Sequence, residues 1–153
     1  MVSLERLIYK YRQSFFTKRR FFTEKMVAIV ATEPSYHSYA TGHSGIIKSG
    51  RTMSRGTNSI SITIDSFNQA PELKNKLESL STTRKIGGES IYRTSIRIGN
   101  CAEDMAALRL LIRTNNKIPL RKIIFSKAVR IQTFETIQPC CNCKSTFPYL
   151  YHG

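Results

Sequence analysis

The fold is decided by the stretch NCAEDMAALRLLIRT, which occupies residues 100–114. Its apolar side chains recur with the three- and four-residue spacing of an amphipathic helix. These side chains are Met105, Leu108, Leu111 and Ile112. Because Asn is a favoured residue at helix N-caps, we predict a helix from Cys101 to about Thr114 with Asn100 as its cap.

Strands and further helices are predicted on both sides of this helix. Upstream, we expect strands at Met26 to Thr32, Gly45 to Lys48, Ser59 to Ser66 and Ile91 to Ile98, and helices from Ser3 and at Pro71 to Leu80. Downstream, Leu120 to Val129 predicts a strand, and Pro139 opens a turn into a short helix that ends near Thr146. Strands that alternate with helices indicate an α/β domain.

Length and composition restrict the class of protein. The chain has 153 residues, of which 41% are hydrophobic, so we predict one domain over residues 1–153 with a buried core. The longest uninterrupted apolar run, Met26 to Ala31, is far shorter than the roughly 20 residues of a membrane-spanning helix. We therefore expect no membrane partner.

The charge is strongly positive along the whole chain. The sequence holds 24 Lys and Arg against 10 Asp and Glu, a net charge of +14. A basic folded surface favours nucleic acid as a partner. The candidate phosphate contacts are Lys18, Arg19, Arg20, Arg51 and Arg55.

The first of these residues belong to a basic N-terminal helix predicted within residues 1–25. Lys and Arg there are interleaved with Tyr and Phe, which suits a surface that pairs with phosphates and stacks on bases. Two alternatives remain open for this segment. It can be a helix with an apolar stripe and a solvated basic face, or a mitochondrial leader, which Glu5 and Glu24 disfavour.

Two short segments carry candidate metal chemistry. They are Cys101-Ala102-Glu103 and Pro139-Cys140-Cys141-Asn142-Cys143, and both open predicted helices. A C-x-x-C turn brings two sulfurs within reach of one ion, and a third cysteine at another helix start completes three ligands. Zinc with three protein ligands and one open position is the catalytic arrangement. We expect both helix N-termini to lower the pKa of the thiols.

Each segment taken alone has a plainer interpretation. Asn100 with Glu103 forms a possible capping box, in which Glu103 would bind only a backbone amide. Cys140 and Cys143 could be a structural zinc pair or a redox dithiol. Cys101 could be an ordinary buried apolar residue. We interpret Cys141 as a bystander in the turn.

Together, in this order, the two segments resemble the signature of the zinc-dependent cytidine deaminase superfamily, C-x-E followed by P-C-x-x-C. The chain is similar to compact bacterial toxin-type deaminases, including the YwqJ-like group. The resemblance implies an α/β fold of three layers, a central mixed sheet with helices on both faces, in which residues 90–147 form the zinc-motif core. It implies that both motifs open helices on one face of the sheet, with a strand between them.

The resemblance also implies the site and the reaction. Zn2+ would be bound by Cys101, Cys140 and Cys143, and Glu103 would be the catalytic proton carrier in hydrolysis of cytosine to uracil. Expected substrate contacts are Ala102, Pro139, Tyr39 and His43, with His37 as a further candidate. A toxin-type deaminase would act in the cytoplasm and have a cognate immunity protein.

The substrate is predicted from two features that point in different directions. A net charge of +14 favours nucleic acid, with single-stranded DNA as our first choice. The all-cysteine ligand set resembles that of free cytidine deaminases, so a nucleoside deaminase is the alternative. A non-enzymatic, zinc-stabilised nucleic-acid-binding module is the second alternative.

Overall fold

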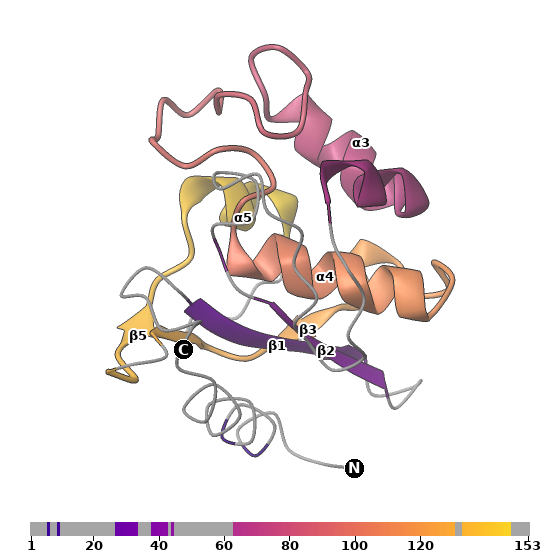
Figure 1. The fold of residues 1–153 in the computed structure, drawn as a ribbon, viewed down its shortest axis with the longest axis vertical. Helices are drawn as coiled ribbons and strands as arrows, with labels where there is room; N and C mark the ends of the chain where they lie inside the picture. The colour runs from indigo at the N-terminus through magenta and orange to yellow at the C-terminus, as the bar shows by residue number, and fades with distance from the viewer. Residues whose placement is uncertain are drawn as a thin grey trace.

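The computed structural model describes Arg6, Tyr9 and residues 27–33, 38–42, 44, 63–130 and 133–147. In chain order its elements are β1 (Val27–Glu33), β2 (Ser38–Gly42), η3 (Ile64–Gln69), α3 (Pro71–Ser79), α4 (Ala102–Arg113), η4 (Leu120–Lys122), β3 (Ile124–Phe125), β4 (Ala128–Arg130), β5 (Thr136–Ile137) and α5 (Cys141–Thr146). The structure mixes strands with helices, which is compatible with the predicted α/β class (Figure 1).

The strands form a sheet in the order β2-β1-β4-β5, and β3 also pairs with β1. Ala31 of β1 lies opposite both Ala40 of β2 and Phe125 of β3. Both neighbours of β1 run antiparallel to it, so the chain crosses from one side of β1 to the other between β2 and β3. The helices α3 and α4 lie in this crossover, and α4 packs against β1 and β2.

The finer fold prediction is met only in part. All strand pairs among the described residues are antiparallel, so the parallel pairs of a mixed sheet are not among them. Figure 1 shows α3, α4 and α5 on the same side of the sheet. The helix, strand and helix of the expected zinc-motif core do follow in the predicted order, as α4, β3–β4 and α5.

The central helix α4 is buried on all sides. Every residue from Ala102 to Leu111 is buried, including the charged Asp104 and Arg109. A helix that is enclosed all round belongs to the core rather than to the surface. The Arg109 guanidinium donates a hydrogen bond to the carbonyl of Thr41 at 3.0 Å, which ties α4 to β2.

The core lies between this helix, the sheet and α3. Its largest fully buried apolar side chains are Phe67, Leu73, Leu77, Ile98, Met105, Leu108, Leu110, Leu111 and Ile118. Phe125 of β3 contacts Phe147 after α5, with ring centroids 4.8 Å apart. No helix in the described part of the chain is long and apolar enough to cross a membrane.

Gly42 sets the distance between β2 and α4. A Cβ atom at this position would lie 2.5 Å from both the Ala102 carbonyl oxygen and the Ala106 amide nitrogen. We therefore expect Gly42→Ala to force strand and helix apart and to lower the free energy of unfolding by about 1–3 kcal/mol, the usual cost of overpacking. Urea unfolding of the two proteins measures this loss, and equal midpoints would show that the contact is looser than described.

The predicted start of α4 needs a correction. Cys101, with an extended backbone at φ −81° and ψ 154°, is the N-cap of α4, and Asn100 precedes it. The capping preference of Asn over Cys is worth only about 1 kcal/mol, so burial of Cys101 in the core outweighs it.

The strand predicted at Ser59 to Ser66 is wrong where the structure describes it. Residues 64–69 form the 3-10 helix η3 instead. The Thr63 amide donates a hydrogen bond to the Ser66 hydroxyl at 3.0 Å. Such local bonds from Ser side chains to the backbone compete with strand pairing, and the alternation of Ile with Ser and Thr does not reveal them.

The strand predicted at Ile91 to Ile98 is also wrong, because these residues form a series of turns. Arg93 has φ 54°, in the left-handed region that strands do not use. The Ser90 hydroxyl accepts a hydrogen bond from the Tyr92 amide at 3.1 Å. The Ile98 amide bonds back to the Gly88 carbonyl at 3.1 Å, so the segment closes on itself as a loop.

The remaining predicted elements are confirmed or lie outside the described residues. The predicted helices at 71–80 and 140–146 and the strand at 26–32 are confirmed as α3, α5 and β1. The strand predicted at 120–129 is divided into η4, β3 and β4. At the start of η4, the Leu120 amide donates a hydrogen bond of 2.9 Å to the Glu72 carboxylate and not to a neighbouring strand. Arg6 and Tyr9 of the N-terminal helix are helical, while the strand predicted at 45–48 lies outside the described residues.

Candidate metal centre

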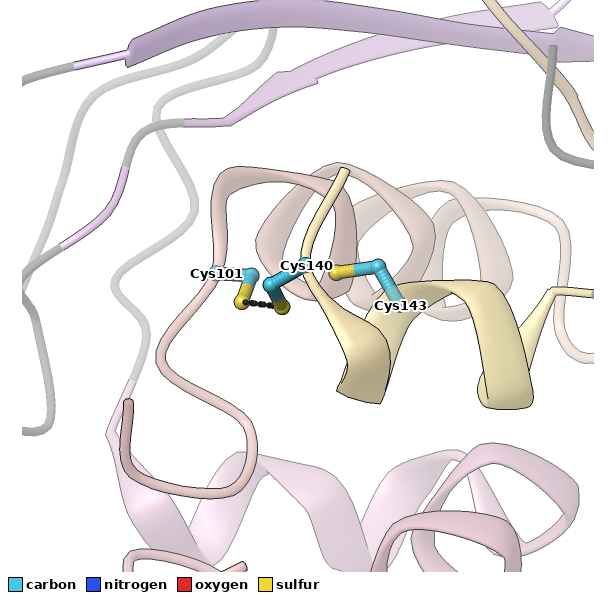
Figure 2. A group of neighbouring side chains, drawn as sticks. All are labelled: Cys101, Cys140 and Cys143. Atoms are coloured by element: carbon cyan, nitrogen blue, oxygen red, sulfur yellow. Dashed lines mark hydrogen bonds between the residues drawn. The ribbon is translucent and has the colours of Figure 1, made fainter. Parts of the chain in front are cut away.

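Three cysteines from distant parts of the sequence converge at the starts of two helices. Cys101 is the N-cap of α4, Cys140 is the N-cap of α5, and Cys143 lies in the first turn of α5. Their Sγ atoms all lie within 4.8 Å of one another. Figure 2 shows the three sulfurs gathered between the loop that enters α4 and the first turn of α5. We call these three residues the thiol cluster.

The thiol cluster fits a single zinc ion. Bonds of about 2.3 Å in a tetrahedral site separate the sulfurs by about 3.8 Å. The Sγ atoms of Cys101 and Cys140 are 3.3 Å apart, and 4.8 Å is the upper limit for the set, so small side-chain movements reach the ideal spacing. No other His, Cys, Asp or Glu of the described residues joins the group. The cluster therefore supplies three of four positions.

The three thiols differ in their tendency to ionise. Hydrogen bonds from Cys101, then from Cys143, lower the pKa of Cys140 to about 2, and the backbone amides of Cys143 and Asn142 add to this effect. The pKa of Cys101 is raised by its hydrogen bond to Cys140 and by burial, although a hydrogen bond from Cys143 opposes the rise. The pKa of Cys143 is raised because its thiol donates to Cys101 and Cys140 and is buried. The predicted lowering is thus correct for Cys140 and wrong, in the metal-free protein, for the other two.

Glu103 lies beside the thiol cluster and is nearly enclosed, with 6% of its surface exposed. Burial raises the pKa of Glu103 to about 7. Hydrogen bonds from its own amide and from the Cys143 thiol oppose this rise, and the charge of Cys140 adds to it. The capping-box alternative is wrong, because the N-cap is Cys101 and the third residue of the helix is Asp104. Glu103 is therefore available for chemistry.

The sequence analysis missed Asp104. This residue is completely buried, and neither of its carboxylate oxygens has a hydrogen-bond partner among the described residues. Burial, and then the neighbouring Glu103, raises the pKa of Asp104 well above its usual value. Nothing in the local pattern distinguishes it from an exposed acid in the first turn of a helix.

Two hydrogen bonds of Asn142 that hold α5 in place were not predicted from the sequence. Asn142, between Cys141 and Cys143, is buried, and its amide oxygen accepts a hydrogen bond from the Ser90 hydroxyl at 2.5 Å. Its amide nitrogen donates to the Ile96 carbonyl at 3.4 Å. The loop that we predicted as a strand thus fixes the turn that carries two of the three thiols.

Some of the other predicted site residues lie at the starts of α4 and α5, and one lies far from them. Pro139 is half-buried next to Cys140, Ala102 is buried beside Gly42, and Cys141 is exposed outside the thiol cluster. The Tyr39 ring lies 5.7 Å from the guanidinium carbon of Arg113, at the far end of the 12-residue helix α4, about 18 Å from its start. The structure therefore does not bring Tyr39 to the thiols.

Several predicted residues lie outside the described part of the chain. They are His37 and His43 and the basic residues Lys18, Arg19, Arg20, Arg51 and Arg55. The role of each stays a prediction.

No protein-family model, curated protein or solved structure matches this chain. The class that the fold and the site define is thus an α/β protein with a three-cysteine cluster that could hold a metal ion.

Proposed function

We propose that the protein is a zinc-dependent deaminase that hydrolyses cytosine to uracil in single-stranded nucleic acid, with DNA as the first choice of substrate. The observation that carries this proposal is a buried carboxylate beside a metal-ligand set that has three members among the described residues. Glu103 lies two residues after one thiol ligand and contacts a second one, Cys143. A structural zinc site needs a fourth protein ligand and has no use for this carboxylate.

Each residue has a defined part in the proposed reaction. Cys101, Cys140 and Cys143 would hold the zinc ion, which supplies an activated water as the nucleophile. Glu103 would take a proton from that water and deliver protons to the ring nitrogen and the departing ammonia. A pKa of about 7 suits this exchange, because such a group both accepts and donates protons near neutral pH. Water and cytosine thus give uracil and ammonia.

The fold supports the same proposal at the level of element order. The helix α4, capped by Cys101, is followed by the strands β3, β4 and β5 and then by α5, capped by Cys140, an order that is compatible with a three-layer deaminase domain. The parallel strands and the second helical layer of that domain are part of the proposal.

The substrate class is proposed from charge. An uncharged nucleoside gives no reason for a net charge of +14 on 153 residues. A negatively charged phosphate backbone would bind to such a basic protein. A free cytidine deaminase is the second candidate, favoured by a cluster that contains three cysteines.

Parallel assays on single-stranded DNA, duplex DNA, RNA and cytidine test the proposal by scoring conversion of C to U. We expect the single strand to react faster than the duplex, because the base must leave the stack to reach the site. Below saturation, its rate should fall steeply between about 50 and 200 mM salt, with a slope of about −0.7 per phosphate contact.

Cytidine is the control, because a substrate without phosphates should respond little to salt. Efficient conversion of cytidine with none of the oligonucleotide would reject the nucleic-acid substrate in favour of the second candidate. Absence of conversion on all four substrates by the zinc-loaded protein would reject deamination itself.

A further inference from the structure

A groove of about 820 Å³ with both polar and apolar lining lies along the loop that we predicted as a strand. Its apolar lining includes Ile91 and Ile96, and its hydroxyl and guanidinium groups come from Thr82, Ser90, Arg93, Thr94, Ser95 and Arg97. Glu89 is its single acidic side chain. Hydroxyls, guanidinium groups and backbone amides are the donors that proteins use for phosphate oxygens. We call this feature the 89–97 groove.

The two arginines of the groove are available to a ligand. Arg93 and Arg97 are both exposed and both line the groove. Arg93 is held at φ 54°, in a turn closed by a 3.1 Å hydrogen bond from its amide to the Ser90 carbonyl. A non-glycine residue in this region is unfavourable, and such strain is often found at binding sites.

An exposed aromatic ring lies in the same loop. Tyr92 is 43% exposed, and its hydroxyl forms a 2.7 Å hydrogen bond with Ser145 of α5. The bond fixes one edge of the ring and leaves much of its surface open. Tyr92 precedes Arg93 in the loop and is not part of the groove lining. Aromatic rings and cationic side chains are the groups that bind single-stranded nucleic acid by stacking and phosphate contacts.

The groove is joined directly to the thiol cluster. Ser90, which lines the groove, bonds to Asn142, which lies one residue before the ligand Cys143. The carbonyl of Ile96, also on the lining, bonds to the same side chain. The loop that forms the groove is therefore bonded to the helix α5 that carries Cys143.

We propose that the 89–97 groove binds the backbone of a single-stranded nucleic acid, with Arg93 and Arg97 on phosphates and Tyr92 stacked on a base. This inference rests on the proposed function for its orientation, since it places the nucleotides that flank the target base. None of the substrate contacts predicted from the sequence lies in this loop, so the inference assigns new ones.

Fluorescence anisotropy of a labelled single-stranded DNA 15-mer, measured in a Glu103→Ala background to prevent turnover, tests the groove. We expect R93Q/R97Q to flatten the log–log salt dependence by about 1.4, at −0.7 per contact, and to weaken binding roughly 25-fold near 0.1 M salt. The matched control R121Q/K122Q removes two exposed positive charges from η4, outside the groove. Its slope and affinity should stay close to those of the parent protein.

The tyrosine has its own pair of variants. Tyr92→Ala should weaken binding roughly 5- to 150-fold, the range for base stacking on an aromatic ring. Tyr92→Phe loses only the bond to Ser145 and should retain most of the affinity. Equal losses in the two variants would contradict stacking.

The outcomes separate the groove from the proposed reaction. Equal binding by R93Q/R97Q and R121Q/K122Q would overturn the groove and leave deamination untouched. Loss of binding in R93Q/R97Q alone, together with no conversion of C to U by the wild type, would support the groove and reject the reaction. If polyglutamate binds tightly and DNA does not, with the same dependence on both arginines, the ligand of the groove is an acidic polypeptide and not a nucleic acid.

Discussion

Replacement of Glu103 by glutamine is expected to lower the rate of deamination by at least a factor of about 10²–10⁴, with the metal retained. Glutamine has nearly the same size and keeps a carbonyl oxygen, but it cannot carry the proton between water and the ring. Steady-state rates and zinc content, measured on the same preparation, check both halves of this expectation. Normal turnover by the variant would reduce Glu103 to a structural residue and reject the mechanism.

The pH dependence of stability tests the raised pKa of Glu103. The pKa of Glu103 is raised from 4.5 to about 7 in the folded protein, so the folded state holds the proton more tightly than the unfolded state. The free energy of unfolding of the metal-free protein should therefore fall by about 3 kcal/mol as pH rises from about 4.5 to about 7. Asp104, whose pKa is also raised by burial, adds a fall of the same sign. Glu103→Gln should therefore show a fall smaller than that of the wild type by the Glu103 contribution, whereas Glu135→Gln, at an exposed position, should show the full fall.

The sequence predicted α3, α4 and α5 to within a few residues, and it predicted that Cys140 and Cys143 lie together, because both predictions depend on local spacing. The apolar periodicity of residues 100–114 predicts α4, and the C-x-x-C spacing predicts that Cys140 and Cys143 share one side of a turn. That Cys101 joins them depended on the order of the two motifs, and the structure brings the three Sγ atoms within 4.8 Å.

The failures come from contacts between distant residues. Alternating side chains at Ile91 to Ile98 suggested a strand, but the bonds that tie Ser90 and Ile96 to Asn142 shape this segment as a loop. The complete burial of Asp104 depends in the same way on elements that pack around α4 from other parts of the chain. The 89–97 groove could not be predicted for the same reason, since it is formed by that loop.

Loss of one thiol should have the second large effect. We expect Cys143→Ser to lose most of its zinc, because a buried member of the thiol cluster is removed and two thiolates remain. Cys141→Ser is the matched control. Cys141 is exposed, lies two residues away and is outside the cluster, so this variant should keep about one zinc per chain. Equal losses in the two variants would mean that the ligand set is wrong.

Zinc X-ray absorption spectroscopy of the wild-type protein tests the central claim most directly, because it counts the ligands by element. An open catalytic site predicts three sulfurs at about 2.3 Å and one oxygen at about 2.0–2.2 Å, without the signature of an imidazole, in the wild type and in Cys141→Ser alike. Four sulfurs, or three sulfurs and one imidazole nitrogen, would show a closed structural site and would contradict the proposed enzyme.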